Sequence, residues 1–492
     1  MKVATKYQML IDGQWVDSSS GKTFESINPG TREVNGVVPQ GEAEDVDRAV
    51  QAARKAFESG PWADMAPSDR GRLLFKVAQK MWANLEVLAE IESKENGQPI
   101  NETKFIVIPH IIDVLEFYAG LANKVQGETL AAAPNRFSYT LREPLGVVGA
   151  IVPWNFPMLL TMWKLAPALA AGNTVVIKPP KEASIGVLEL VKIFQEAGVP
   201  DGVINVVTGS GATVGQAIAS HPGIDKVAFT GSTATGRMIM QAASQNVTPV
   251  SLELGGKSPN IIFEDVNLED AVNVCAFGIY FNKGEVCIAG SRILVQDSIY
   301  DKFMDLFVKR AQSIRVGYQL DPSTQMGPQI SEAQLQRIES YVQKGSEEGA
   351  ELVTGGKRLD HPTGGYYYMP TVFGNVSTTM TIAQEEIFGP VASVIRFKDE
   401  EEALKIANDT MYGLCAGIWT NDIKRAHRMA KNIKSGTVFI NTYGVLDSNG
   451  PFGGMKQSGF GRELGVQAMD MYTQIKHVWV DLSPQALNWY GQ

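Results

Sequence analysis

Cysteine and histidine are both scarce in this sequence. The 492 residues include three cysteines, Cys275, Cys287 and Cys415, and five histidines scattered along the chain. Three cysteines cannot build a disulfide framework, and so low a number is typical of a protein in a reducing compartment. No group of cysteines and histidines has the spacing of a zinc site, so we expect no metal.

A positive charge excess and long apolar runs are absent as well. Lys and Arg number 44 against 53 Asp and Glu, a net charge of −9, which predicts no nucleic-acid footprint. The most apolar stretches are interrupted by Pro153, Pro157, Pro167 and Gly172, and none approaches the length of a membrane-spanning helix. The N-terminus is polar and has no signal-peptide core. We therefore expect a cytoplasmic protein without membrane or nucleic-acid partners.

The length predicts two or three domains, and the pattern of apolar residues predicts an α/β fold. After a short N-terminal hairpin and several helices, strands and helices alternate from Gly146 onward. Repeated βα units with short connections predict a parallel sheet with helices on both faces, which binds ligands at the carboxyl ends of its strands. A second βα series is expected over 260–441. The expected elements are a hairpin in 8–35, helices over 43–58, 67–94, 101–124, 156–171, 184–198, 211–221 and 233–245, and strands in 146–153, 173–179, 204–209, 226–232 and 249–259.

Two segments read as strands without a neighbour in the main sheets. Residues 125–148 alternate apolar and polar side chains like an exposed hairpin, which is either a surface flap or an edge offered to a partner subunit. Residues 476–482 are strand-like and have no hairpin mate nearby in the sequence. They must therefore pair with a distant segment, in this chain or in a partner subunit.

One cysteine lies where a nucleophile is often placed. Cys287 belongs to FNKGEVCIAGSR (281–292), at the point where a helical pattern breaks at glycine and an apolar strand begins. Such a junction lets a thiol face a cleft. The alternative is that Cys287 is a small buried hydrophobic residue, as most free cysteines are.

Three polar residues lie at positions in or beside the expected sheet where they could take part in catalysis or ligand binding. Glu253 lies between leucines, where burial would raise its pKa and suit a general base; the alternative is a core glutamate bonded to backbone or arginine. Asn155, in a proline-flanked turn after a strand, could donate to an oxyanion or be an ordinary turn residue. Lys178 ends a parallel strand, so it points into the ligand crevice or into solvent.

A phosphate site is predicted at one strand–helix turn. No G-x-G-x-x-G motif opens a helix, because the stretch Gly209–Gly215 has one residue too many before its last glycine. Gly231-Ser-Thr-Ala-Thr-Gly236 follows a strand directly and opens a helix, whose free N–H groups suit an anion. The alternative is a turn that needs glycine only for its conformation.

Taken together, these residues resemble the NAD(P)-dependent aldehyde dehydrogenases over essentially the full length of the chain. That family has a Rossmann-like parallel-sheet cofactor domain, an α/β catalytic domain and a small β-hairpin domain that joins subunits. The resemblance implies a cofactor domain in 1–124 and 147–257, a catalytic domain in 258–471 and an oligomerisation domain in 125–146 and 472–492. The matching segments are PWNFP (153–157), VIKPP (176–180), FTGST (229–233), LELGGKSPN (252–260), FNKGEVCIAGSR (281–292), EEIFGPV (385–391) and PFGGMKQSGFGRELG (451–465).

The resemblance also implies roles for single residues. Cys287 is the expected nucleophile and Glu253 the general base, and Asn155 is an oxyanion donor together with the Cys287 backbone N–H. A water-activating glutamate implies hydrolysis to the carboxylic acid rather than acyl-CoA formation. The implied cofactor contacts are Trp154, Lys178, Lys181, Gly231, Ser232, Leu254, Glu386 and Phe388. The implied substrate tunnel consists of Phe156, Met162, Trp163, Val286, Ile288, Leu446 and Phe452, an apolar and aromatic set that favours a hydrophobic or aromatic aldehyde, although Asp447 at the mouth could attract an amino-aldehyde.

The sequence departs from the family pattern in two places. Lys181 stands where many NAD-preferring members have glutamate, and a lysine could attract a 2′-phosphate, so we expect NADP to be used, alongside or in preference to NAD; the alternative is a solvated Lys181 that points away from the ribose. Lys283 and Glu285 replace residues that are commonly glutamine. Glu285 would disfavour the thiolate if it faced Cys287, and we expect the loop geometry to turn it outward.

Two other functional classes remain open on the sequence. A cysteine hydrolase or acyltransferase would need a partner histidine, and none of the five histidines lies in a motif-like context. A structural protein on this fold, such as a lens-type crystallin, would not need Cys287, Glu253, Asn155 and Lys178 together. A dimer or tetramer is the oligomeric state that the resemblance implies.

Overall fold

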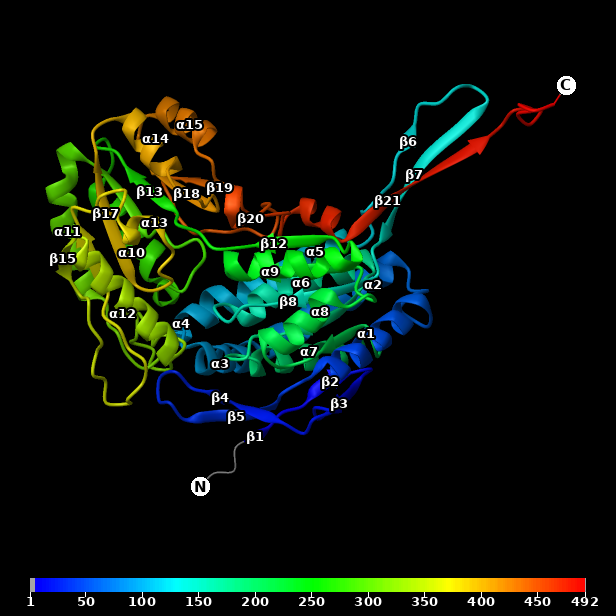
Figure 1. Cartoon of the computed structure of the whole chain (residues 1–492), viewed down its shortest axis with the longest axis horizontal. Coiled ribbons are helices and arrows are strands. Elements are labelled where there is room, and N and C mark those ends of the chain that lie inside the picture. Colours follow the sequence, from blue (N-terminus) through cyan, green and yellow to red (C-terminus); the bar gives the residue numbers. More distant parts are fainter. Residues whose placement is uncertain (1–4, 492) are drawn as a thin grey trace.

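The computed structural model describes residues 5–491 and contains two α/β bodies and a projecting arm. Figure 1 shows the two bodies side by side, with the arm leaving the larger body at the end opposite the smaller one. Each body is built around one sheet, of eight strands in the larger and seven in the smaller. This arrangement confirms the predicted fold class of two parallel-sheet units with an added β element.

The larger sheet has five parallel strands at its centre. Every residue of β8, β9 and β11 is buried, because helices cover both faces, and this explains why these strands are apolar without alternation. The N-terminal hairpin, with its turn at Asp12, extends one edge, and β20 from the glycine-rich C-terminal segment pairs with β12 at the other. In sheet order the strands are β20 (Gly459–Phe460), β12 (Val250–Glu253), β11 (Lys226–Thr230), β8 (Val147–Ile151), β9 (Thr174–Lys178), β10 (Ile204–Val206), β2 (Met9–Ile11) and β3 (Gln14–Val16).

The helices of the larger body follow the expected pattern with one division. The segment predicted as a single helix over 67–94 is two helices, because Asn84 leaves the helical conformation between them. Helix α6 is buried at all fifteen positions, as an all-round apolar helix must be. The helices are α1 (Ala43–Glu58), α2 (Pro67–Ala83), α3 (Leu85–Asn96), α4 (Ile100–Glu102), α5 (Ile108–Leu121), α6 (Pro157–Ala171), α7 (Ile185–Ala197), α8 (Gln216–Ser220) and α9 (Thr233–Ala243), and a small sheet of β1 (Thr5–Lys6), β5 (Val34–Pro39) and β4 (Thr23–Ile27) lies beside them.

The smaller body repeats the parallel βα plan. Only β15 at its edge runs antiparallel to its neighbour. In sheet order the strands are β15 (Glu351–Thr354), β16 (Thr371–Gly374), β17 (Val391–Phe397), β14 (Arg292–Gln296), β13 (Pro259–Ile262), β18 (Cys415–Trp419) and β19 (Thr437–Ile440). The helices are α10 (Leu268–Tyr280), α11 (Tyr300–Ser313), α12 (Glu332–Glu347), α13 (Thr381–Gln384), α14 (Glu400–Asn408) and α15 (Ile423–Asn432).

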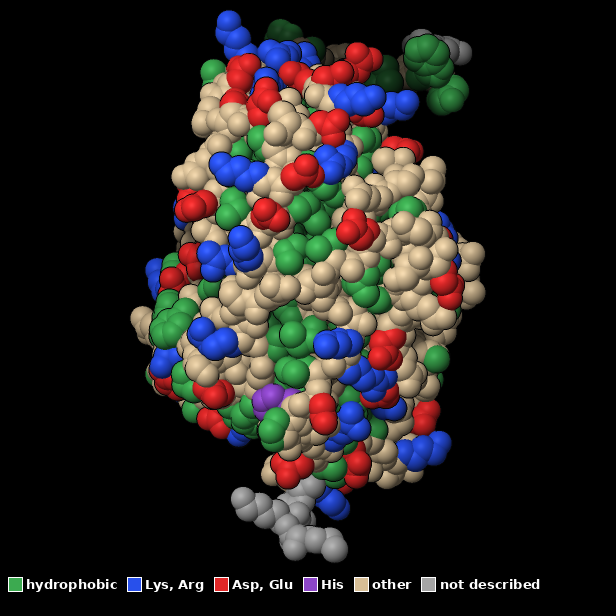
Figure 2. Space-filling model, turned by 90° about the vertical axis from the view of Figure 1, so that its left-hand side faces the viewer, with side chains coloured by type: hydrophobic (Ala, Val, Ile, Leu, Met, Phe, Trp, Pro, Cys, Tyr) green, Lys and Arg blue, Asp and Glu red, His purple; other side chains and the backbone are tan. Residues whose placement is uncertain are grey.

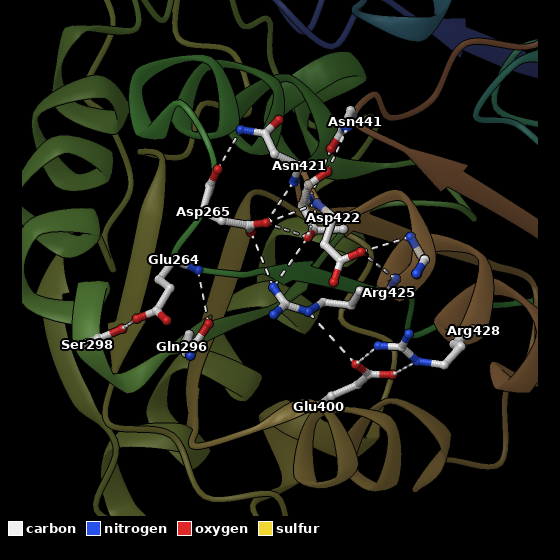
Figure 3. Close-up of polar contacts among 12 residues, drawn as sticks. Glu264, Asp265, Gln296, Ser298, Glu400, Asn421, Asp422, Arg425, Arg428 and Asn441 are labelled. Carbon is white, nitrogen blue, oxygen red and sulfur yellow. Dashed lines mark hydrogen bonds and ion pairs between the residues drawn. The ribbon is translucent and has the colours of Figure 1, made fainter.

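A polar cluster fixes the last two helices of the smaller body at the carboxyl ends of β13 and β18. Figure 3 shows Asp265 facing the start of α15, where its carboxylate accepts the Asp422 backbone N–H at 3.0 Å and pairs with Arg425 at 3.3 Å. Arg428 in turn makes a two-point contact with Glu400, at the start of α14. Figure 2 looks onto this body, and acidic and basic side chains are interspersed over the face that it shows.

The arm is a three-stranded antiparallel sheet of β6 (Thr129–Leu130), β7 (Arg136–Pro144) and β21 (Thr473–Asp481). Strand β21 pairs with β7 along its whole length, from Thr473 opposite Pro144 to Asp481 opposite Arg136. The distant mate expected for the C-terminal strand is therefore the hairpin of the same chain. Apolar side chains of the arm, among them Phe137 and Trp479, are exposed. Within residues 5–491, no helix combines the length and apolar character needed to cross a bilayer.

Candidate active site

Cys287 lies between two cavities and lines both of them. The polar cavity, of about 260 Å³, is formed where the two bodies meet. The apolar cavity, of about 290 Å³, lies on the other side of the thiol. The polar cavity is lined by Pro153, Trp154, Asn155, Thr230, Gly231, Ser232, Leu254, Gly255, Cys287, Gln334, Arg337, Glu386 and Phe388. The apolar cavity is lined by Ile106, Val107, His110, Phe156, Leu159, Leu160, Trp163, Phe277, Phe281, Val286, Cys287, Ile288, Gly444, Val445, Leu446 and Phe452.

A left-handed turn brings the thiol to this position. After α10 ends, Asn282, Lys283 and Gly284 have φ values of 42°, 52° and 76°. Two non-glycine residues in this region store strain, which the surrounding contacts must balance. A Cβ on Gly284 would meet the Gly389 carbonyl oxygen at 2.2 Å, so this position requires glycine. The turn ends the helix before β14 and leaves Cys287 in the connecting loop.

The surroundings of Cys287 favour the protonated thiol over the thiolate. Burial raises the pKa of Cys287, and the carboxyl groups of Glu386 and Glu253 raise it further, while the backbone N–H groups of Cys287 and Ile288 oppose the shift. Formation of the thiolate therefore needs a proton acceptor or a nearby positive charge. Cys275 and Cys415 are buried and line neither cavity, so Cys287 alone of the three cysteines faces the candidate site.

Glu253 ends β12 as a buried carboxyl group without hydrogen bonds. Neither of its carboxylate oxygens has a partner among the described residues, so the alternative of a core glutamate bonded to backbone or arginine does not hold. Burial raises the pKa of Glu253 well above its usual value, and nearby Glu463 adds to this effect, while Lys164 opposes it. Sequence reasoning missed Lys164, which bonds Thr230 Oγ1 at 2.6 Å and pairs with Glu463 inside the protein.

Asn155 is held in place by hydrogen bonds to its side chain and to its backbone carbonyl. Its side-chain Nδ2 donates to the Glu285 carbonyl oxygen at 3.0 Å. Its backbone carbonyl accepts from the side-chain amides of Asn96 and Asn282, each at 2.9 Å. One amide N–H of Asn155 is thus used for positioning, and the second is available at the polar cavity that this residue lines.

Lys283 and Glu285 form a buried ion pair beneath this loop. Lys283 Nζ lies 3.1 Å from Glu285 Oε2, and it also donates to Asn96 Oδ1 at 2.9 Å and Asn282 Oδ1 at 2.7 Å. Glu285 Oε1 accepts the Ile330 backbone N–H at 3.0 Å. The expectation that Glu285 turns outward is wrong: both side chains are fully buried, because each charge is compensated by the other.

Six of the eight expected cofactor residues line the polar cavity, and two do not. The six are Trp154, Gly231, Ser232, Leu254, Glu386 and Phe388. Lys178 is buried and donates to the Pro179 carbonyl oxygen at 2.6 Å, and burial lowers its pKa to about 8. Lys181 is exposed, and its Nζ lies 5.5 Å from the ring centroid of Phe24. Sequence reasoning missed Gln334 and Arg337, which reach the cavity from α12 and carry no motif.

The polar cavity has the groups that a dinucleotide needs. Ser232 caps α9 by accepting the Thr235 N–H at 3.2 Å, so the positive end of this helix faces the cavity and suits a pyrophosphate. Glu386 accepts the Gly256 N–H at 3.0 Å, and burial raises its pKa to about 7. Its remaining acceptor capacity suits ribose hydroxyls. Trp154 and Phe388 meet edge to face with centroids 5.2 Å apart and give the cavity an aromatic wall.

The apolar cavity contains six of the seven expected substrate residues. They are Phe156, Trp163, Val286, Ile288, Leu446 and Phe452. Met162 does not line the cavity: it is fully buried, and the helix turns its side chain about 100° away from that of Trp163. Leu159 and Leu160, which sequence reasoning missed, complete an i, i+3, i+4, i+7 stripe from Phe156 to Trp163. This helical spacing could have identified them.

No group of three or more His, Cys, Asp or Glu side chains in residues 5–491 forms a candidate metal site. The arrangement suits covalent catalysis: the Cys287 thiol lies between an apolar chamber and a polar one, and the Asn155 amide lines the polar one. Glu253 lines neither chamber, but its carboxyl group is close enough to raise the pKa of Cys287. A polar electrophile could reach the thiol from the apolar side while a second ligand occupies the polar side.

Known proteins are similar to this chain in sequence and fold. A model of the aldehyde dehydrogenase family matches residues 15–478. An aldehyde dehydrogenase of Emericella nidulans is 49% identical over 471 residues, which cover 96% of this chain and 94% of the relative. The NAD+ complex of an aldehyde dehydrogenase from Bacillus cereus has a TM-score of 0.96 at 45% identity, with 97% of each chain covered. A point mutant of betaine aldehyde dehydrogenase from Staphylococcus aureus, in complex with NAD+ and with a BME-modified cysteine, has a TM-score of 0.97 at 42% identity, with 99% of this chain and 98% of that chain covered.

Proposed function

The chain belongs to the aldehyde dehydrogenase family and oxidises aldehydes with NAD(P), and from this premise we propose which of its residues carry out the reaction. Cys287 is the nucleophile, Glu253 the general base and Asn155 an oxyanion donor. The observation that supports this assignment most strongly is that Cys287 lines both cavities, so that one thiol can meet an aldehyde on its apolar side and a nicotinamide on its polar side.

The chemistry follows from these positions. The Cys287 thiol passes its proton to solvent, and the resulting thiolate attacks the aldehyde carbon. The negative charge that develops on oxygen is stabilised by the Asn155 amide and the Cys287 backbone N–H, at about 3–4 kcal/mol for each donor. The bound cofactor supplies the acceptor for the hydride that leaves the thiohemiacetal. Glu253, whose raised pKa makes it a strong proton acceptor, deprotonates the water that cleaves the resulting thioester to the carboxylic acid.

The substrate class that fits the apolar cavity is a hydrophobic or aromatic aldehyde. Among the described residues, no arginine or lysine lines this cavity, so the carboxylate of a semialdehyde would be buried without a positive partner. We expect kcat/KM for benzaldehyde to exceed that for succinic semialdehyde by at least about 100-fold, since about 3 kcal/mol of desolvation corresponds to that factor. A spectrophotometric assay of reduced cofactor, with hexanal as an uncharged aliphatic control, measures this ratio.

Equal or better use of the semialdehyde would contradict this substrate class. A cationic aldehyde is an informative third substrate, since one relative is named a betaine aldehyde dehydrogenase and Asp447 of this chain is exposed close in sequence to the cavity-lining Leu446. Preference for the cationic aldehyde over hexanal would redirect the assignment toward amino-aldehydes.

For the cofactor, we propose that Lys181 favours NADP over NAD. Its exposed ammonium group lies over the Phe24 ring, 5.5 Å from the ring centroid, and its flexible stem allows it to turn toward a 2′-phosphate. We expect Lys181→Glu to lower the NADP/NAD ratio of kcat/KM about tenfold, because one exposed attraction of about 1 kcal/mol is replaced by repulsion. Lys181→Gln, which removes the charge without reversing it, should give an intermediate ratio. A wild-type kcat/KM with NAD that greatly exceeds that with NADP would refute the proposal.

We also propose that residues 1–124 and 147–257 form the cofactor domain, 258–471 the catalytic domain, and 125–146 with 472–492 an arm that joins subunits into a dimer or tetramer. The exposed apolar side chains of the arm, including Phe137, Ile475 and Trp479, support this role. Sedimentation of the full chain as a monomer would contradict it. The three unpaired cysteines favour the cytoplasm as its location.

A further inference from the structure

Two polar atoms inside the apolar cavity have no partner. His110 Nε2, from α5, and Trp163 Nε1, from α6, are both buried and make no hydrogen bond with any residue in 5–491, and both side chains line the cavity. The two rings meet edge to face with centroids 6.4 Å apart, so their polar atoms belong to one region of the wall. Trp163 also packs on Phe452, at 5.1 Å between centroids, which fixes the indole ring.

Unpartnered polar atoms are costly in such surroundings. Apart from Cys287, the other described residues of the lining have apolar side chains or are glycine, so none of their side chains can bond these two nitrogens. Buried donors and acceptors in native proteins are almost always satisfied, and a binding pocket commonly places a few polar groups in an apolar lining to orient its ligand. Phenylalanine or leucine at either position would fill the same wall without the cost.

The chemistry of the two nitrogens specifies what satisfies them. An indole N–H can only donate, whereas a neutral imidazole nitrogen can accept. Burial lowers the pKa of His110, against the opposing influence of Asp113 and Asp447, so a neutral ring is favoured. A hydroxyl group matches both nitrogens, because its oxygen accepts from Trp163 while its hydrogen is donated to His110. A carboxylate does not, since a neutral imidazole and two nearby acidic residues provide no positive charge.

We propose that the aldehyde oxidised by this enzyme carries a hydroxyl group away from its carbonyl carbon, and that His110 and Trp163 bind this hydroxyl. This inference rests on the proposed assignment of the apolar cavity to the aldehyde. The volume of about 290 Å³ is at the low end for small-molecule sites, which limits the substrate to a single ring or a short chain. The substrate class is thus narrowed from hydrophobic or aromatic aldehydes to hydroxylated ones.

The test compares hydroxyl and methyl isosteres across variants. The kcat/KM values of the purified full-length enzyme are measured for the 2-, 3- and 4-hydroxybenzaldehydes and the matching methylbenzaldehydes. We expect the wild type to prefer the hydroxyl compound at least about tenfold for one ring position, and His110→Phe and Trp163→Phe each to bring that ratio down to about one or below. Electronic effects of the substituent on the aldehyde cancel, because the same ratio is compared between variants.

Controls separate recognition from damage to the fold. Phe277→Leu changes the shape of the same cavity without touching its polar atoms and should leave the hydroxyl/methyl ratio unchanged. His110→Gln retains a donor and an acceptor and should restore part of the preference that His110→Phe removes. His110→Phe should unfold thermally at or above the wild-type temperature, because it removes an unsatisfied buried atom.

The outcomes also distinguish a failure of this inference from a failure of the proposed assignment of the apolar cavity to the aldehyde. If the wild type shows no hydroxyl preference at any ring position, or if His110→Phe and Trp163→Phe leave the preference intact, the inference is overturned while aldehyde oxidation in this cavity stands. Val286→Trp and Leu159→Phe fill the cavity. If these variants keep the wild-type kcat/KM for both substrate series, the aldehyde does not bind there. In that case the inference and the assignment of the cavity to the aldehyde both fail.

Discussion

Cys287→Ala is expected to abolish aldehyde oxidation, with kcat/KM falling by at least about 10,000-fold. Alanine cannot form the thiohemiacetal, and nothing else that lines either cavity is a comparable nucleophile. The measurement is the absorbance of reduced cofactor after aldehyde and NAD(P) are mixed with enzyme at stoichiometric concentration. At that concentration even one turnover per subunit is visible, so the loss of the covalent step can be distinguished from slow product release.

A matched cysteine variant controls for the substitution itself. Cys275→Ala removes a buried thiol that lines neither cavity and accepts a weak hydrogen bond from Asn260 at 3.3 Å. It should retain activity with, at most, a small loss of stability. Full activity in Cys287→Ala, or equal loss in both variants, would rule out Cys287 as the nucleophile.

Glu253→Gln provides the complementary result within the same assay. Because Glu253 is proposed to act only after the thioester forms, the glutamine variant should release about one equivalent of reduced cofactor per subunit in a burst and then turn over slowly. A variant without a burst would move the role of Glu253 to activation of the thiol. The unbonded carboxylate oxygens make this a clean substitution, since no hydrogen bond is lost with them.

Lys283→Gln is expected to lower the free energy of unfolding by about 3–5 kcal/mol, because it leaves the charge of Glu285 buried without its partner. Burial lowers the pKa of Lys283 and raises that of Glu285 to about 7, while the attraction between the two groups opposes both shifts. Glu92 and Glu102, which also interact electrostatically with Lys283, would lose the same compensation. Urea unfolding followed by fluorescence measures the loss.

The double variant Lys283→Gln, Glu285→Gln tests whether the pair is the cause. It removes both charges and keeps hydrogen-bonding amides, so it should recover most of the stability lost in the single variant. The single variant should also lower kcat, since Lys283 holds Asn96 and Asn282, whose amides position the Asn155 carbonyl. Additive losses in the double variant would show that the two side chains act independently.

The contrast between Glu253 and Glu285 shows how far a local pattern can be interpreted. Glu253 was predicted to be desolvated because leucines flank it on a strand, and a strand fixes the environment of its side chains through its own period. Glu285 lies in an irregular loop, where no period applies. Its burial depends on Lys283 and on Ile330, which is 45 residues distant in the sequence.

The residues that line the apolar cavity also divide into those that a local pattern predicts and those that it does not. Helical spacing predicts the stripe from Phe156, at the N-cap of α6, to Trp163. His110 and Phe452 join this stripe from α5 and from the C-terminal loop, which no local pattern indicates. The strand that pairs with β21 could likewise not be predicted, because pairing between residues more than 300 positions apart produces no local sequence pattern.

The sequence by itself determined the parallel βα architecture, the junction that bears Cys287 and the buried setting of Glu253, because each depends on apolar periodicity or on residues adjacent in the chain. Tertiary structure alone decided that Cys287 separates two cavities, that Lys283 neutralises Glu285, and that His110 and Trp163 place polar atoms in an apolar wall. These features are distances between side chains from separate elements, and they exist only once the chain has packed.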